Sequence, residues 1–105
     1  MSRSRRSRRL FYRRSFLNRP GHHAGAHAIA EIREAFGDEV RYVDAELTIS
    51  DCRRVIVLDF SVASNESANV RSNALHKARV LRDVVVAFHD QLAEAYADEV
   101  RTARR

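Results

Sequence analysis

The alternation of hydrophobic and polar residues indicates two β-strands in the middle of the chain. Between residues 40 and 50 every second side chain is apolar, which is the period of a strand with one buried face. The apolar positions are Val43, Ala45, Leu47 and Ile49. Residues 55–62, after the polar tetrad 51–54, are rich in β-branched residues, include Phe60 and alternate in the same way. We predict that the two segments form an antiparallel hairpin.

A different spacing begins at residue 66 and predicts one helix to about residue 100. Ser64-Asn65-Glu66 supplies acceptors for the first helical amides, and no Gly or Pro interrupts residues 66–105. The helix would be roughly 50 Å long and would overhang an eight-residue strand of roughly 27 Å, so either the first segment or another chain has to cover its far end. The apolar stripe, spaced 4-3-4-3-4-3, consists of Ala74, Ala78, Leu81, Val85, Phe88, Leu92 and Ala95.

Residues 22–36 fit either a helix or a strand. Their Ala, Glu, Arg and Ile content, followed by Gly37, favours a helix. A hairpin of only two strands is marginal in water, however, so a strand over 26–35 that turns at 36–39 completes a better sheet. We therefore predict an α+β fold, a three-stranded antiparallel meander backed by one long C-terminal helix, and keep the helical alternative for residues 22–36.

The charge is divided unevenly along the 105 residues. The net charge of +5 combines eight arginines and no acid in residues 1–19 with 11 basic and 14 acidic residues in the remainder. Such an arginine- and serine-rich segment cannot bury its guanidiniums, so we expect a disordered basic arm over 1–20. Pro20-Gly21 marks the boundary, and a small α+β domain is expected over 21–105.

The basic arm is the segment with the clearest chemistry. Its guanidiniums can neutralise phosphates and release counterions, and its aromatic residues can stack on unpaired bases. Contact with an acidic protein, adsorption to anionic lipid and a targeting peptide are the alternatives. The candidate nucleic-acid-binding residues are Arg3, Arg5, Arg6, Arg8, Arg9, Phe11, Tyr12, Arg13, Arg14 and Arg19.

The histidines of the chain do not make up a complete metal or catalytic site. His22, His23 and His27 have no dependable third ligand, and ordinary solvated histidines explain them better than a metal site. His89 and Asp90 are adjacent on a helix and are not expected to face each other.

Nothing else in the chain indicates catalysis. Cys52 stands alone beside Arg53 and Arg54, and it fits an incidental turn residue better than a reactive thiolate. No nucleotide or hydrolase motif occurs. We predict no catalytic residue, metal or cofactor.

Three stretches carry a resemblance to known proteins: LNRPGHHAGAHAIAEI, AELTISDCRRVIVLDFSV and NALHKARVLRDVVVAFHDQL. They resemble small, functionally unassigned proteins of actinobacteria and their bacteriophages, over residues 17–92. The resemblance implies a biological setting and no residue role.

The sequence thus favours a non-enzymatic nucleic-acid-binding accessory protein, acting on RNA or DNA through its arm. Its apolar runs are too short to span a membrane, and a cytoplasmic location is expected, in the host if the gene belongs to a phage. The alternative is a protein-interaction module or small phage or bacterial regulator. That protein would dock on a second copy or on another protein through Phe88, Leu92 and Tyr96 of the long helix.

Overall fold

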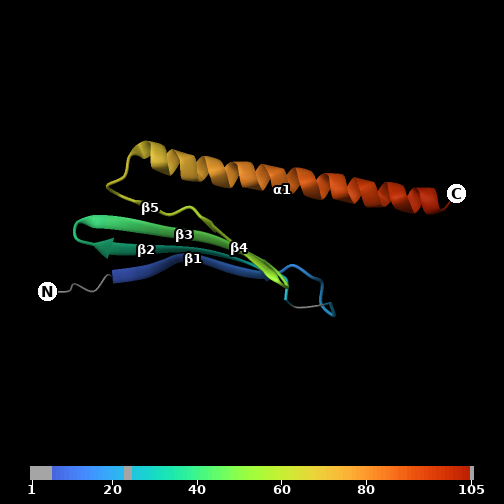
Figure 1. Ribbon diagram of the computed structural model, residues 1–105, viewed down its shortest axis with the longest axis horizontal. Helices are drawn as coiled ribbons and strands as arrows, with labels where there is room; N and C mark the ends of the chain where they lie inside the picture. The colour runs from blue at the N-terminus through green and yellow to red at the C-terminus, as the bar shows by residue number, and fades with distance from the viewer. Residues whose placement is uncertain (1–5, 23–24, 105) are drawn as a thin grey trace. The chain divides into compact units, whose positions relative to one another are not determined.

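The computed structural model describes residues 6–22 and 25–104 and has the predicted α+β composition. Its elements are β1 (Arg6–Phe16), β2 (His27–Gly37), β3 (Val40–Asp51), β4 (Arg54–Asp59), β5 (Val62–Ala63) and α1 (Ala68–Ala103) (Figure 1). The chain divides into two units, Met1–Ala74 and Leu75–Arg105, each of which is described by itself.

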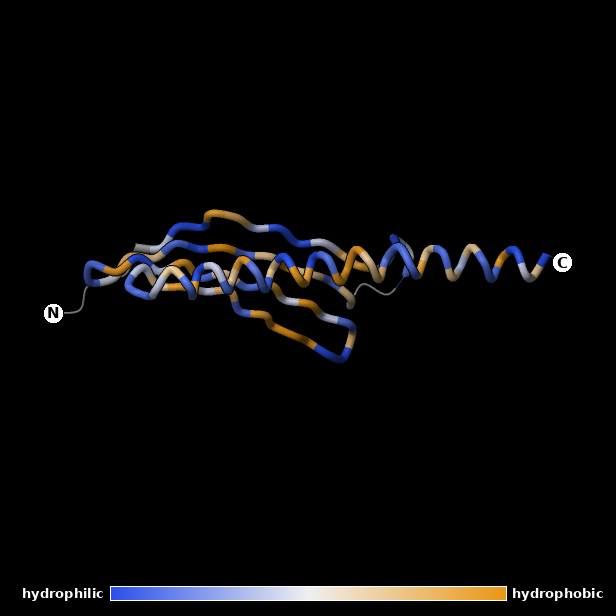
Figure 2. The backbone as a smooth tube through the Cα atoms, turned by 90° about the horizontal axis from the view of Figure 1, so that it is seen from above, coloured by the Kyte–Doolittle hydropathy of each residue, from blue (hydrophilic) through white to orange (hydrophobic). Residues whose placement is uncertain are grey.

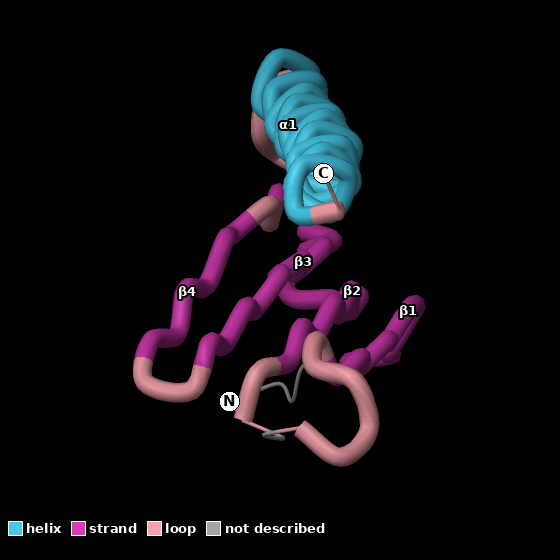
Figure 3. The backbone as a smooth tube through the Cα atoms, turned by 90° about the vertical axis from the view of Figure 1, so that its right-hand side faces the viewer, coloured by secondary structure: helices cyan, strands magenta, loops and turns pink. Residues whose placement is uncertain are grey.

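The strands form one antiparallel meander in the order β1-β2-β3-β4 (Figure 3), and the short β5 pairs with β3. The predicted hairpin is confirmed as β3 and β4, but the second predicted strand, 55–62, is divided: β4 ends at Asp59, and Val62 begins β5. Residues 27–37 form β2, so the strand interpretation is correct and the helical alternative is wrong. Helical propensity is a weak preference, and pairing on both sides, with β1 and with β3, overrides it here.

Two expectations about the sheet are wrong. The sheet has four main strands rather than three, and residues 6–16 are not disordered but form β1. Disorder was expected because buried guanidiniums are costly, but β1 lies at the sheet edge, where the side chains of residues 8, 9, 13 and 14 stay exposed. Residues 1–5 of the expected arm, including Arg3 and Arg5, lie outside the described residues.

The strand registers assign the side chains to two faces of the sheet, and β3 is mainly apolar on one face and mainly polar on the other; the alternation of hydropathy along the strands is visible in Figure 2. Glu34 is paired with Val43, and Leu47 with Leu58, so these side chains share what we call the Glu34 face. The other side, which we call the Glu31 face, carries the polar side chains of β3, among them Glu46, which is paired with Glu31. The alternation predicted for β3 and β4 is thereby confirmed.

The two tight turns of the meander each hold one residue in the left-handed region. Glu39 has φ 60° in the β2–β3 turn, and Cys52 has φ 59° in the β3–β4 turn. Beside Cys52 the Arg53 N–H donates to the Asp51 carbonyl at 2.6 Å, which closes a three-residue turn. Neither residue is glycine, so both turns adopt a backbone conformation that L side chains disfavour.

The helix begins later than predicted because Ser64 bonds to the sheet. Its N–H donates to the Arg41 carbonyl at 2.7 Å, and its Oγ accepts the Arg41 N–H at 2.9 Å. Glu66 also bonds back, accepting the Ala63 N–H at 3.1 Å. With these acceptors engaged in the strand connection, α1 starts at Ala68.

The described residues bury very little apolar volume. The buried hydrophobic residues are Ala26 and Ala35, the buried polar ones are Glu34 and Ser50, and no large side chain is fully buried. In α1 no residue is buried at all. Most of the large apolar side chains of β4 and α1 are exposed in the described residues.

Candidate nucleic-acid interface

The arginine-rich segment is an edge strand interrupted by a β-bulge at Leu10. The pairing steps from Arg9 opposite Arg33 to Phe11 opposite Ile32, so Leu10 has no partner residue on β2. The extra residue reverses the alternation of side chains. As a result Phe11 lies on the apolar Glu34 face, while Tyr12 lies on the Glu31 face, the same side as Arg9.

On the Glu31 face the arginines of β1 contact aromatic rings. The guanidinium carbon of Arg9 lies 4.5 Å from the Tyr12 ring centroid, and that of Arg14 lies 5.1 Å from the Phe16 ring centroid. Both distances are within the range of cation–π attraction. Tyr12 and Phe16 remain 43% and 58% exposed. The strand therefore presents guanidinium and aromatic groups together at its surface.

Glu31 neutralises part of the positive charge on this face. Its Oε2 lies 3.0 Å from Arg9 Nη2 and 3.6 Å from Arg33 Nη1. One carboxylate thus serves one arginine from β1 and one from β2. Arg33 was not among the predicted site residues, although the alternating Glu31 and Arg33 of a strand over 26–35 could have placed it on the same side.

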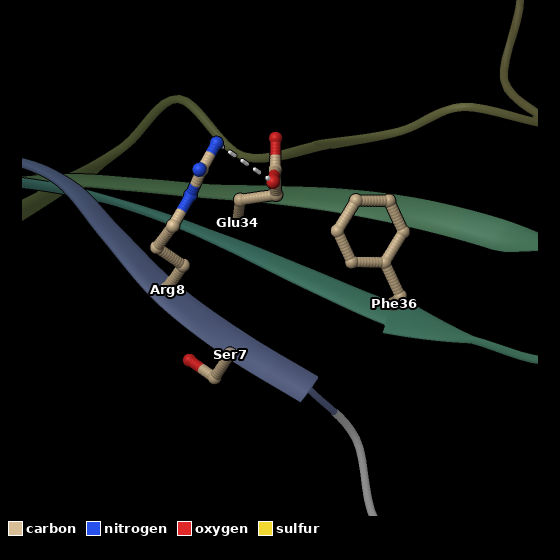
Figure 4. A pocket seen from close by; sticks show the side chains of 4 residues that line it. All are labelled: Ser7, Arg8, Glu34 and Phe36. Atoms are coloured by element: carbon tan, nitrogen blue, oxygen red, sulfur yellow. Dashed lines mark hydrogen bonds and ion pairs between the residues drawn. The ribbon is translucent and has the colours of Figure 1, made fainter.

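Glu34 performs the same role on the other face and is itself buried, with a side-chain exposure of 8%. Arg8 Nη2 lies 3.4 Å from its Oε1, and Arg41 donates to its Oε2 from Nε at 2.8 Å and from Nη2. Of these residues Arg8 and Glu34 line an open hollow, together with Ser7 and Phe36 (Figure 4). The guanidinium of Arg8, which lines the hollow, is already paired with the carboxylate of Glu34, so the hollow offers no uncompensated positive charge to an anion.

Three arginines of the predicted set keep their charge uncompensated. Arg13, Arg14 and Arg19 form no ion pair with any residue that the structure describes. Arg13 is opposite Ala30 and Arg14 is opposite Ile29, so they extend to different faces of the same edge. The free positive charge of the site is therefore concentrated at the C-terminal half of β1. For Arg6 the structure describes the backbone alone.

The three predicted partner-binding residues lie on α1. Phe88 and Tyr96 are 65% and 59% exposed, and Leu92 is 36% exposed. Their spacing of four residues places them along one side of the helix. They are separate in sequence and in structural unit from the arginines of β1.

The remaining candidates assemble no further site in the described part of the chain. His27 Nδ1 lies 3.3 Å from the Gly25 carbonyl, His23 is outside the described residues, and the described His, Cys, Asp and Glu form no metal-binding group of three. His89 Nδ1 and Asp90 Oδ1 do approach to 3.0 Å, contrary to expectation, because the ends of the two side chains bend toward each other. Both are mostly exposed, which leaves the pair open to water.

Among the helices of the described residues there is none whose length and apolar content would let it span a bilayer.

Comparisons with other proteins add no functional assignment. No protein-family model matches the chain, and neither the curated proteins nor the solved structures include one that resembles it significantly.

Proposed function

We propose that the chain is a non-enzymatic nucleic-acid-binding accessory protein of the cytoplasm, and that it binds through β1. The observation that carries this proposal is the pair Arg13 and Arg14, which are exposed and without an acidic partner among the described residues. Two uncompensated guanidiniums on adjacent residues of an edge strand attract a polyanion. We define the basic edge as Arg8, Arg9, Arg13 and Arg14.

The strand geometry supports contact with a phosphate backbone along its length. The basic edge places two guanidiniums on each face of β1, those of Arg9 and Arg14 on the Glu31 face and those of Arg8 and Arg13 on the Glu34 face. Because Arg13 and Arg14 lie on opposite faces, a nucleic-acid strand that runs beside the sheet edge can contact both. Arg8 and Arg9 contribute less, since Glu34 and Glu31 already compensate them.

The exposed aromatic rings favour single-stranded nucleic acid over a plain duplex. Tyr12 and Phe16 are each held beside a guanidinium on the Glu31 face, and they are accessible to an unpaired base. Base stacking on an aromatic side chain is available to RNA and single-stranded DNA and requires no sequence readout. In a duplex the base faces are already stacked, so the rings would have no equivalent partner.

The direct test replaces the two uncompensated arginines in the full chain. We expect Arg13→Ser/Arg14→Ser to weaken binding to a fluorescent single-stranded RNA and to reduce the salt slope of log K by about 1.4, at about 0.7 for each phosphate contact. Fluorescence anisotropy over a series of salt concentrations measures both quantities. Deleting residues 1–19 is a poorer experiment, because it also removes β1 from the sheet.

A matched control removes the same charge elsewhere. Arg101→Ser/Arg104→Ser also lowers the net charge by two, at the end of α1. It should leave the slope nearly unchanged. If the two double variants lose affinity equally, general electrostatic attraction explains the binding and the basic edge has no specific role. Unaltered binding of Arg13→Ser/Arg14→Ser would refute the proposal.

A second candidate function is supported by the exposure of α1. Phe88, Leu92 and Tyr96 lie open on the helix, as expected for a protein-interaction module or a small regulator that docks through it. Substitution of Leu92 by Asp discriminates the two functions. It should abolish capture of a protein partner and leave the salt slope of RNA binding intact, whereas the Arg13→Ser/Arg14→Ser variant should behave in the opposite way.

A further inference from the structure

The charges of α1 are segregated along its length. Residues 68–82 contain four basic residues and no acid, and residues 83–100 contain five acidic residues and no base. Two copies of such a helix attract each other when they run antiparallel, because the basic half of each then lies against the acidic half of the other. In a parallel pair the like-charged halves would be adjacent.

The same helix carries an apolar stripe with the period of a coiled coil. The positions separated by alternate steps of four and three residues are 74, 78, 81, 85, 88, 92 and 95. Val85 and Phe88, in the middle of the stripe, are 53% and 65% exposed. Ala74 and Leu81 are half-buried, so the apolar surface that the stripe offers to a second helix lies mainly from Val85 onward.

We propose that α1 binds the α1 of a second copy of this chain, with the two helices antiparallel and centred between Val85 and Phe88. This arrangement sets Val85 against Phe88 of the second copy, and Leu81 against Leu92 of the second copy. Each apolar layer then combines the two alternating positions of the stripe, as the layers of an antiparallel helix pair require. The centre of the apolar stripe lies about one helical turn beyond the boundary between the two charged halves, which is at residues 82 and 83.

The residues that flank the stripe fit the same register. Leu75 comes beside Tyr96 of the second copy, which explains why both of these large apolar side chains, 68% and 59% exposed, lie just outside the stripe. On the opposite flank Lys77 comes beside Asp98 of the second copy. By two-fold symmetry each contact occurs twice in the dimer. One register thus accounts for the apolar layers, the extra apolar residues and one pair of opposite charges that flanks the stripe.

The helix also needs support from packing at its centre. Val84, Val85 and Val86 are consecutive β-branched residues, which lower the helical propensity of this segment. No residue of α1 is buried in the single chain. A second helix against the stripe would supply the packing from which most helices in proteins derive their stability.

Charge reversal in the full chain tests both the contact and its direction. Lys77→Glu and Asp98→Lys each replace two attractive contacts by two repulsive ones, and each should raise the dimer Kd about tenfold. Mixing the two variants in equal amounts should recover most of the original affinity. In the mixed dimer the glutamate introduced in one chain would lie beside the lysine introduced in the other, and the unchanged Lys77 and Asp98 would lie beside each other. Sedimentation equilibrium over a range of concentrations measures the Kd.

The mixing experiment separates the proposed contact from local effects. Asp98→Lys also removes a contact within the same helix, between Arg101 and Asp98 at 3.4 Å, but mixing cannot repair that loss. Leu92→Asp, which places a carboxylate in two apolar layers, should abolish the dimer. A monomeric wild-type chain would overturn the proposal. So would a dimer that tolerates Leu92→Asp, or one whose charge variants fail to recover on mixing.

Discussion

Removing the charge of Glu34 should destabilise the chain more than removing the charge of Glu31 on the opposite face of the sheet. Glu34→Gln preserves the size of the side chain and removes the negative charge that Arg8 and Arg41 share. Glu34 is 6% exposed, so water compensates little for the loss. The substitution should therefore weaken the β1–β2–β3 connection on the Glu34 face.

The magnitude follows from the burial of the three groups. Breaking a fully buried ion pair costs about 3–5 kcal/mol, and a surface pair contributes about 0–1 kcal/mol. Here the carboxylate is buried, but the side chains of Arg8 and Arg41 are 72% and 46% exposed and can turn to water. We expect an intermediate loss of about 2 kcal/mol, which corresponds to a fall in Tm of roughly 8–16 °C.

The assay is urea or thermal unfolding at one fixed protein concentration, because self-association would otherwise shift the midpoint. Glu31→Gln is the matched control: it makes the same chemical change on the same strand, but on the more open face. Glu31 is 31% exposed at its side chain and contacts Arg9 and Arg33. Its replacement should cost less than about 1 kcal/mol. Equal losses for the two variants, or none for Glu34→Gln, would refute the reasoning.

Two further predictions concern the connections of the sheet. Glu39→Gly should stabilise the chain by about 0.5–1 kcal/mol, because the relief of the strain at φ 60° outweighs the extra entropy that glycine gives the unfolded chain. Glu39→Ala keeps the strain and should bring no such gain, and urea unfolding measures both variants. Ser64→Ala should cost about 1 kcal/mol and speed hydrogen exchange of the Arg41 amide, which loses its 2.9 Å bond to Ser64 Oγ. Ser72→Ala, at an exposed position of α1, serves as its control, and unchanged exchange at Arg41 would contradict the role assigned to Ser64.

The sequence alone determined the elements whose periodicity is strong and local. The alternation over 40–50 and 55–62 specified β3, β4 and the sides to which their residues point, because one misplaced residue would reverse every apolar position. The spacing after residue 66 likewise specified the long helix. Both ends of α1 differed by two or three residues from the predicted 66–100. The start differed because Ser64 and Glu66 could serve either the helix or the sheet, and a local pattern cannot choose between them.

The state of the arginine-rich segment was decided by tertiary structure. Its composition indicated disorder, because nothing local compensates its charge, whereas Glu31 and Glu34 of β2 do so from across the strand pairing. That pairing also divided the candidate site, leaving Arg13 and Arg14 with free charge and Arg8 and Arg9 with carboxylate partners. Residues more than twenty positions apart in sequence make these contacts, so the strand register, and not the order of residues, sets which guanidiniums remain available.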